Sequence, residues 1–468
     1  MPSTSRFTDR SAAVSQDAWR QVTRAPRRRP TPPPASVVAI QPRSAEDIAA
    51  ILLDPRRYPS PVRPVGSGSS STRAHQTAAG TLMDMTALDR ILATTPDTVT
   101  VQAGVRLHQL AEHLLAEGME LAGGCAAPNR TVGGAISSAT LAGALPGDGG
   151  QLASSVLRLT LINSKGRRVE VTERLPDLLR LVRMSYGLLG VVYSVTLRVR
   201  PIRPYAVRKT RFEFAELTEL APALLDPAAA VRASLLPFRD RIYLEQRYPA
   251  AGDGRAAMFS WKLRDWANNS ALPRMARSVS RVVPMRHLRD PLIDGVTEAT
   301  SALLNNRFVE SGSNAAEQSG RFKRLVLDRD VVNSVWMFPA ERFAPALRTW
   351  QKFCVRHYQN TGFRCDLPAE FWRIDRDRYS LLSPSHEGSV FALNIRSTRH
   401  DGWDNFILEC AEFAAHFRGI PVFNQTLSFK ASDARRAYGE RLERFRVMRQ
   451  RLDPADRLLN QYFAERIG

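Results

Sequence analysis

Two short stretches rich in glycine, serine and threonine carry the residue types best suited to hold a phosphate. The first reads Gly66-Ser-Gly-Ser-Ser-Ser71, and the second reads Thr131-Val-Gly-Gly-Ala-Ile-Ser-Ser-Ala-Thr140. Glycine lets backbone N–H groups approach a phosphate closely, and hydroxyl side chains add further hydrogen-bond donors. Two such loops on one domain could therefore hold the two ends of a long anionic cofactor. Two flexible surface loops are the plainer interpretation.

The first loop does not match the common nucleotide-binding fingerprints. A parallel-sheet dinucleotide site needs a third glycine and a following helix, whereas here a strand pattern follows at residues 82–86. A P-loop would end in Gly-Lys-Ser/Thr, and this loop does not. The loop alone therefore leaves a diphosphate cradle and a flexible linker as alternatives.

The elements that must position these loops follow from hydrophobic spacing and capping signals. Ser44 with Asp47 three residues later resembles a capping box, which predicts a helix beginning there. Apolar residues at helical spacing predict a second helix over residues 107–117. We interpret Thr131–Ile136 as a glycine-rich turn. Short strands are expected at residues 36–40, 62–65, 82–86, 98–103, 156–162, 168–171 and 190–199.

Composition and pattern divide the chain into four parts. Residues 1–35 are rich in Ser, Arg and Pro, which predicts a flexible basic tail. Strand and helix patterns then fill residues 36–203. Residues 204–430 mix helical and strand-like runs, which indicates a second, α+β domain. One amphipathic helix over about 431–452 is expected to open the last segment, 431–468.

Five motifs in the first two hundred residues occur in one order and at fitting spacing. They are Val65-Gly-Ser-Gly-Ser-Ser, Leu82-Met-Asp-Met, Val99-Thr-Val-Gln-Ala-Gly104, Thr131-Val-Gly-Gly-Ala-Ile-Ser and Ser185-Tyr-Gly-Leu-Leu-Gly-Val-Val192. Together they resemble the PCMH-type FAD-binding domain of the vanillyl-alcohol oxidase superfamily. The closing Leu452-Asp-Pro-Ala-Asp-Arg-Leu-Leu-Asn460 is similar to the end of its sugar-acting branch, which includes aldonolactone and alditol oxidases.

The resemblance implies an α+β fold with FAD as the cofactor. A two-subdomain FAD-binding domain would occupy residues 36–203, a substrate or cap domain 204–430, and a C-terminal helix and tail, 431–468, would return to the FAD domain. One loop would wrap the diphosphate, the second would lie along the diphosphate and flavin edge, and one strand residue would touch the cofactor by its backbone. The residues implied are, in that order, Val65, Gly66, Ser67, Gly68, Ser69 and Ser70; Thr131, Gly134, Ser138 and Thr140; and Val192.

Departures from the family pattern concern the flavin attachment. Many relatives carry a histidine at the place of Ser69, which bonds covalently to the flavin 8α-methyl group. Serine cannot form that link, so we expect noncovalent FAD. His75 lies six residues further on, and we interpret it as a surface histidine. Cys125 fits a buried structural thiol better than a second flavin link. The relatives' Gly-Thr-His-Gly reads Ala139-Thr-Leu-Ala here, so the flavin-facing wall should be more apolar.

The substrate side departs further from the family. Relatives use a Glu-x-Arg pair and a lysine; here Arg373 survives, Gln425 replaces the lysine, and Phe371 replaces the glutamate unless Glu370 takes its place. Negative charge that develops on a flavin accepting hydride needs a cation or oriented dipoles. We therefore expect Arg373 to stabilise charge and Asn424 with Gln425 to orient the substrate oxygen. Tyr462 or His416 would relay a proton, and plain structural roles for both stay open.

Charge and cysteine usage set the partners we expect. The chain has 66 basic and 46 acidic residues, a formal net charge of +20 that favours anionic partners or simply marks a soluble basic surface. No groove-reading helix or zinc motif is evident, so we expect no nucleic acid partner. Four cysteines without metal-ligand spacing predict no metal and no disulfide scaffold, and a cytoplasmic protein, with an anionic membrane surface as an alternative location.

We therefore expect an FAD-dependent oxidoreductase that takes hydride from an alcohol, hemiacetal or lactone C–H of a small organic substrate to flavin N5. The aromatic residues near the substrate positions suggest a substrate larger and more apolar than a free sugar. One alternative is a lipid-linked sugar oxidase acting at a membrane surface. Another is a basic binding protein that kept the fold and lost the chemistry.

Overall fold

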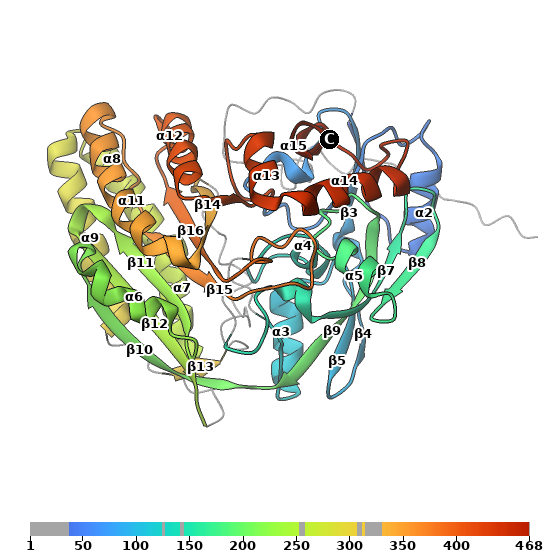
Figure 1. Ribbon diagram of the computed structural model, residues 1–468, viewed down its shortest axis with the longest axis horizontal. Coiled ribbons are helices and arrows are strands. Elements are labelled where there is room, and N and C mark those ends of the chain that lie inside the picture. The colour runs from blue at the N-terminus through green and yellow to red at the C-terminus, as the bar shows by residue number, and fades with distance from the viewer. Residues whose placement is uncertain are drawn as a thin grey trace, which may run out of the picture.

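Three sheets with helices packed on them make up the computed structural model, which describes residues 37–123, 127–140, 145–251, 258–306, 311–313 and 330–467 (Figure 1). Two sheets are complete before residue 202, and the strands of the third begin at residue 204. The α+β class is confirmed, and the change from one set of sheets to the next falls at residues 202–203. The expected tail, 1–35, and Cys125 lie outside the described residues.

The first subdomain is a parallel sheet of order β1-β3-β2 covered by one helix. Buried Ile48 and Ile51 of that helix pack against Val62 and Met83 of the strands. Ser44 Oγ accepts the Asp47 N–H at 3.0 Å, so the expected helix start is confirmed. The elements are β1 (Val37–Ile40), α2 (Ala45–Leu53), β2 (Val62–Val65), η1 (Arg73–His75), β3 (Gly80–Asp84) and η2 (Met85–Ala87).

The second subdomain is an antiparallel sheet of order β4-β5-β9-β7-β8, with β6 paired to β9. Its elements are β4 (Ile91–Thr94), β5 (Thr98–Gln102), α3 (Leu107–Ala116), β6 (Met119–Leu121), α4 (Val132–Ile136), η3 (Leu152–Ser155), β7 (Val156–Ile162), β8 (Arg168–Thr172), α5 (Pro176–Val182) and β9 (Val191–Pro201). The turn expected at Thr131–Ile136 is wrong: this segment forms the short helix α4. Thr131 Oγ1 caps it by accepting the Gly134 N–H at 3.3 Å, which compensates for its two glycines.

The substrate domain is built on an eight-stranded sheet of order β13-β10-β12-β11-β15-β16-β14-β17. Its strands are β10 (Pro204–Phe212), β11 (Ala230–Leu236), β12 (Arg241–Pro249), β13 (Ser311–Ser313), β14 (Val332–Pro339), β15 (Ala369–Ile374), β16 (Val390–Ser397) and β17 (Ile420–Pro421). Its helices are η4 (Phe214–Glu216), α6 (Leu217–Leu225), η5 (Pro237–Arg239), α7 (Met258–Trp266), the π-helix η6 (Ala267–Ala271), α8 (Leu272–Val282), α9 (Arg286–Asn306), α11 (Ala340–Thr361) and α12 (Trp403–His416).

The two faces of this sheet have different partners, because side chains alternate along each strand. Phe371 on β15 points to one face, where its ring lies 4.9 Å from that of Phe343 on α11. Ala392 on β16 belongs to the other face, where it clusters with Met184 and Ala139 of the FAD-binding domain. The second face therefore borders the FAD-binding domain along β16 and β14.

The C-terminal segment forms hydrogen bonds with the first subdomain. Arg457 donates to the carbonyl of Ile51 at 2.7 Å, and its own carbonyl accepts the Val62 N–H at 2.7 Å. The single helix expected over residues 431–452 is wrong, since Gly439 at φ 52° separates two helices. The elements are α13 (Ala431–Tyr438), α14 (Glu440–Leu452) and α15 (Gln461–Ile467).

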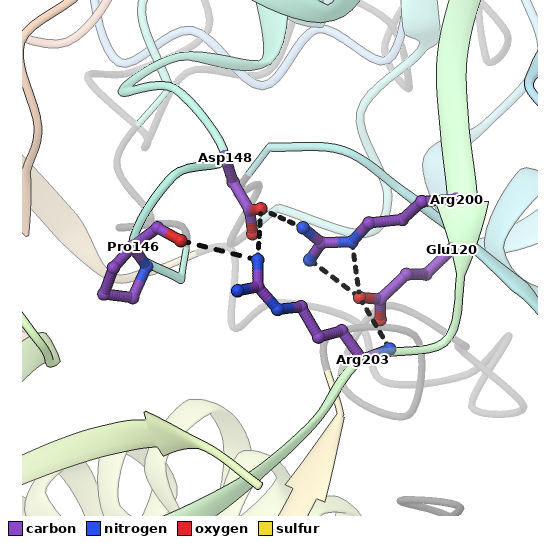
Figure 2. A network of polar contacts seen from close by, with 5 residues as sticks. All are labelled: Glu120, Pro146, Asp148, Arg200 and Arg203. Carbon is purple, nitrogen blue, oxygen red and sulfur yellow. Dashed lines mark hydrogen bonds and ion pairs between the residues drawn. The ribbon is translucent and has the colours of Figure 1, made fainter. Parts of the chain in front are cut away.

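A network of charged side chains fixes the point where the chain crosses between domains (Figure 2). Arg200 on β9 binds Glu120 Oε1 through Nη2 at 2.8 Å and pairs with Asp148 through Nη1. Arg203, just before β10, reaches Asp148 at 3.2 Å and the carbonyl of Pro146 at 3.4 Å. Both carboxylates are almost fully buried. The network thus ties β6, β9 and the loop at 146–148 to the start of the substrate domain.

Candidate active site

The two small-residue loops face each other across a cleft with a cavity volume of about 110 Å³. One wall comes from the loop that leaves β2, and the opposite wall comes from α4 and the residues on either side of it. Most of the sequence-predicted cofactor residues and one predicted substrate residue line it: Gly66, Ser67, Gly68, Ser69, Ser70, Thr131, Gly134, Ser138, Val192 and Asn424.

Glycine is required where the backbones of the two walls approach most closely. A Cβ atom at Gly66 would overlap the Thr131 hydroxyl, and one at Gly133 would lie 2.8 Å from the Cβ of Ala103. Gly68 adopts φ 65°, a left-handed conformation that favours glycine. The flexible-linker interpretation of residues 66–71 is therefore wrong, because this loop is packed into the wall of a cleft.

Several polar atoms at the cleft are buried without a hydrogen-bond partner among the described residues. They include His75 Nδ1, Asn424 Oδ1 and the neighbouring Gln425 Oε1. Buried polar atoms without partners are rare in folded proteins and often mark a binding site. A narrow cleft with glycine-lined walls and polar atoms at its edge fits a bound FAD, with the diphosphate at the loops. Residues 66–70, Thr131 and Gly134 would hold it.

His75 is not a surface histidine, which corrects the sequence-based interpretation. It lines the cleft beside Arg63. Burial, together with the charge of Arg63, lowers the pKa of His75 to about 4, so its imidazole is neutral near pH 7. Its position depends on the η1 turn, where Asn460 Nδ2 of the C-terminal segment donates to the Gln76 carbonyl at 2.7 Å. The sequence gives no local signal for this arrangement.

Two arginines in the cleft wall were not identified from the sequence. Arg63 donates to the carbonyls of Leu458 at 2.9 Å and Tyr186 at 2.8 Å, and burial lowers its pKa to about 10. Arg130 directly precedes the capping Thr131, and it donates to Gly134 O at 3.1 Å and to the hydroxyl of Ser138. Both guanidinium groups therefore place positive charge beside the cleft.

Three other predicted residues lie next to the cleft rather than in its lining. Val65 is buried at the end of β2, directly before the first loop. Thr140 is held by Gln151, whose Oε1 accepts both the backbone N–H and the hydroxyl of Thr140. The backbone carbonyl of Gln425 accepts the Val335 N–H at 3.1 Å, which attaches this residue to the sheet of the substrate domain.

The structure does not bring Arg373 to the cleft. Arg373 shares the helix-covered face of the sheet with Phe371, and its guanidinium donates to the carbonyls of Leu224 at 3.0 Å and Asp226 at 2.6 Å. This buried guanidinium caps backbone carbonyls at the C-terminal end of α6, which is a structural role. Charge stabilisation at the flavin must therefore come from another group.

Neither expected proton relay reaches the cleft lining. The Tyr462 hydroxyl donates to the carbonyl of Phe423, and burial raises the pKa of this phenol to about 12. His416 is exposed in the last turn of α12, where its ring lies 4.9 Å from that of Phe417. The plain structural interpretation of both residues fits these positions better.

A row of polar side chains on the second face of the sheet leads away from the first loop. Ser71 Oγ donates to Asn333 Oδ1 at 2.8 Å, and Asn333 Nδ2 lies 3.5 Å from Asn394 Oδ1. Asn394 pairs in register with Glu370, which lies 3.8 Å from Arg396. Glu370, rather than Phe371, therefore lies on the second face. Side chains alternate between the two faces of a strand, so the strand-like pattern of residues 389–395 could have identified Asn394 as a candidate site residue. The sequence does not reveal which face of the sheet Asn394 occupies.

Comparison with protein families agrees with this geometry. Residues 36–172 match a family described as FAD binding domain, and residues 195–466 match the family described as D-arabinono-1,4-lactone oxidase, more than half of the chain. The chain belongs to the D-arabinono-1,4-lactone oxidase family. It is thus an FAD-linked oxidoreductase, and the interpretation as a binding protein without chemistry is not supported.

Relatives within and beyond the D-arabinono-1,4-lactone oxidase family align along almost the whole chain. L-gulonolactone oxidase of Mus musculus is 26% identical over 436 residues, which cover 90% of this chain and 93% of that protein. L-gulono-1,4-lactone dehydrogenase of Mycobacterium tuberculosis is 22% identical and covers 92% and 95%. The solved structure of cholesterol oxidase from B. sterolicum shares the fold, with a TM-score of 0.70, 15% identity and coverage of 92% and 94%.

The structure also bears on location and metals. Within the described ranges, no helix is long and apolar enough to cross a bilayer. In the same ranges, no group of three or more His, Cys, Asp or Glu residues is placed to hold a metal ion. Cys354, Cys365 and Cys410 are free thiols.

Proposed function

We propose that this protein oxidises a lactone or a related CH–OH compound, using noncovalently bound FAD as the hydride acceptor. The observation that supports it most is the cleft itself, in which two glycine-lined walls meet beside unpartnered His75, Asn424 and Gln425. Membership in the D-arabinono-1,4-lactone oxidase family and the lactone-acting relatives support the substrate class.

Noncovalent attachment rests on the first loop. Ser69 lines the cleft where many relatives carry the histidine that bonds to the flavin. Its hydroxyl lies 3.2 Å from that of Ser67, so the two serines can offer hydrogen bonds to a diphosphate. His75 is the remaining imidazole in the described cleft wall. Because its position lies beyond the diphosphate loop, we assign it a hydrogen-bonding role rather than a covalent one.

FAD accepts hydride from a carbinol or lactone carbon and thereby gains negative charge on its pyrimidine edge. We propose that Arg130 supplies the charge that neutralises it, in place of the expected Arg373. Arg130 contacts Ser138 and the carbonyl of Ala139, whose side chain packs on the sheet of the substrate domain. Ser138 and Ala139 thus lie at the border where a flavin must meet substrate, and a preorganised cation there is effective.

The substrate would lie between the cleft and the polar row on the sheet. Asn424 and Gln425 keep unpartnered carbonyl oxygens that can accept a substrate hydroxyl. Asn333 and Asn394 extend this polar surface, and Glu370 lies at its far end. The row offers hydrogen-bonding groups for a lactone with several hydroxyls, which favours a more polar substrate than the one expected from the aromatic residues.

Anaerobic reduction of the bound flavin tests this function. The holoenzyme would be mixed with aldonolactones, alditols, free sugars and simple alcohols, and the flavin absorbance near 450 nm would be followed. We expect bleaching by at least one aldonolactone and none by simple alcohols. Bleaching by none of these compounds would reject the lactone and CH–OH assignment, although the flavin would remain bound.

A second candidate is the oxidation of a lipid-linked sugar at an anionic membrane surface. The net charge of +20 and the exposed apolar side chains of α8 and α9 favour it. A peripheral membrane protein needs no spanning helix, which is compatible with the described helices. Bleaching by a polyprenyl-linked sugar, but not by the matching free sugar, would distinguish this candidate from the first.

A further inference from the structure

The helices α8 and α9 lie on the outside of the substrate domain, away from the FAD-binding domain (Figure 1). These helices and their connecting turn carry large exposed apolar side chains. Six of these side chains are between 38% and 79% exposed: Val282, Met285, Leu288, Leu292, Val296 and Leu303. Single exposed apolar residues are common, whereas a contiguous group marks an interaction surface. We call this group the α8–α9 face.

The residues of α9 in this group share one narrow stripe. At 3.6 residues per turn, positions 288, 292, 296 and 303 fall within roughly 80° of the helix circumference. The buried side of α9 is separate, since Ile293 packs with Leu272 and Ala276 of α8 and with Leu367. The exposed stripe is therefore not needed to hold the helix on its domain.

The charges around the stripe are positive toward solvent. Arg274, Arg281 and Arg286 are exposed on or beside the two helices. The acidic residues of α8 and α9 are directed to other partners: Asp290 to Arg289 and Tyr358, Asp294 to Arg364, and Glu298 to Arg239. The α8–α9 face thus combines apolar side chains with arginines that form no ion pair with any acidic residue in the part of the chain that the structure describes.

We propose that the α8–α9 face docks on an anionic lipid bilayer. Helices that lie in a membrane interface pair an apolar stripe with basic residues, and each basic residue near an anionic surface strengthens the attraction. A second copy of the chain is a poorer occupant, because it would bring the same arginines together on a protein of net charge +20. An anionic bilayer suits both features of the face, because its headgroups attract the arginines and the acyl chains beneath them accept the apolar stripe.

Docking here would bring the bilayer close to a second cavity of the substrate domain. The inner side of α9 contributes Ser301 and Asn305 to this cavity, and the sheet contributes Glu370 and Trp372. Glu370 also ends the polar row that begins at the FAD cleft. The inference deepens the second candidate function and rests on it for its biological purpose, but docking can be measured without any substrate.

Vesicle sedimentation tests the proposal on the full-length holoprotein. Vesicles of phosphatidylcholine with an equal part of phosphatidylglycerol would be compared with pure phosphatidylcholine at about 0.1 M salt. We expect the wild type to bind the anionic vesicles at least tenfold more tightly. The double variant Leu288→Asp with Leu292→Asp, and separately Arg281→Glu with Arg286→Glu, should each lose at least tenfold in binding.

The matched control is Leu92→Asp with Leu408→Asp, which changes two leucines of similar exposure, 45% and 54%, elsewhere on the surface. It should bind like the wild type, and an unchanged flavin spectrum would show that each variant is folded. Three results would overturn the proposal: no binding by the wild type, equal loss in the control, or a wild-type dimer that Leu288→Asp with Leu292→Asp dissociates. The last result would assign the face to a second copy. None of them would affect the flavin-bleaching test.

Discussion

The close approach of Gly66 to Thr131 is the residue-scale feature on which the cleft depends. In Gly66→Ala the new Cβ would overlap the Thr131 hydroxyl, so the two walls must separate. We expect FAD affinity to fall by about 10–100-fold, equivalent to about 1.4–2.8 kcal/mol. Gly388→Ala is the control, because nothing lies within 4 Å of a Cβ at that position. Fluorescence titration with FAD measures both, and equal affinities would contradict the geometry.

The charge proposed for Arg130 can be measured as a reduction potential. Arg130→Gln keeps hydrogen-bonding capacity but removes the positive charge, so the reduced, anionic flavin should be less favoured. We expect the two-electron midpoint potential to fall by roughly 30 mV, which corresponds to about 1.4 kcal/mol. Arg130→Lys should recover part of the shift, as should adding Gln425→Lys.

The control for this prediction is Arg106→Gln. Arg106 also bonds a backbone carbonyl, that of Asn129 at 2.9 Å, but it does not line the cleft. Its potential should match the wild type. If Arg130→Gln only lowers thermal stability and leaves the potential unchanged, then Arg130 has a structural role alone.

His75 gives the apoprotein a pH dependence with a definite sign. Its folded pKa of about 4 lies below the unfolded value of 6.5, so the unfolded chain binds a proton first as the pH falls. This contribution leaves stability unchanged above about pH 6.5 and lowers it progressively between about pH 6.5 and 4. Urea unfolding of apo His75→Gln should therefore show a smaller stability loss from pH 7.5 to pH 5 than the wild type. An identical loss in both proteins would reject the assignment.

Residue types pointed to the two loops that line the cleft but not to the groups on the substrate side. The reason is that the substrate-side side chains contact residues far away in the sequence. Gly66, Ser69 and Thr131 are needed for close backbone approach, a local property that composition reveals. Arg373 instead binds carbonyls 144 to 149 residues away, so its sequence context carries no sign of its role. The position of His75 likewise depends on Asn460 and the C-terminal segment, which hold its turn in place.

At the scale of elements, the network at the domain crossing should carry measurable stability. Glu120 accepts hydrogen bonds from Arg200 Nη2 at 2.8 Å and Nε at 3.1 Å, and its side chain is about 1% exposed. Glu120→Gln keeps the shape but removes the charge, so we expect a loss of about 2 kcal/mol in the free energy of unfolding. The control is Glu170→Gln, whose pair with Arg158 is 52% and 60% exposed and should contribute about 0–1 kcal/mol. Equal urea midpoints would show that the network adds no stability.

Elements were predicted best where one local signal dominates. The capping box at Ser44 and the alternation in β9 were sufficient for α2 and the longest strand of the FAD-binding domain. The short helix α4 was missed because two glycines disfavour it, and the Thr131 cap together with the close packing of Gly133 against Ala103 compensates. The break at Gly439 was missed because periodicity continues across it from α13 to α14.

At the scale of the whole molecule, the C-terminal segment is what closes the FAD-binding domain. Arg457 bonds a backbone carbonyl of α2, 406 positions earlier, and Asn460 bonds the carbonyl that follows η1, 384 positions earlier. The cleft walls, the polar row on the sheet and the interdomain network thus belong to one continuous structure. Since the substrate domain borders the FAD-binding domain along β14 and β16, the arrangement fits an FAD-linked oxidoreductase whose substrate domain adjoins the cleft.

The most direct test of this account is a titration of the purified full-length protein with FAD, followed by acid precipitation. We predict one FAD bound per chain, a flavin absorbance band shifted from that of free FAD, and a raised midpoint of thermal unfolding. After precipitation the yellow colour should appear in the supernatant. A folded protein that stays colourless in excess FAD would contradict the central claim, and colour retained in the pellet would contradict noncovalent attachment.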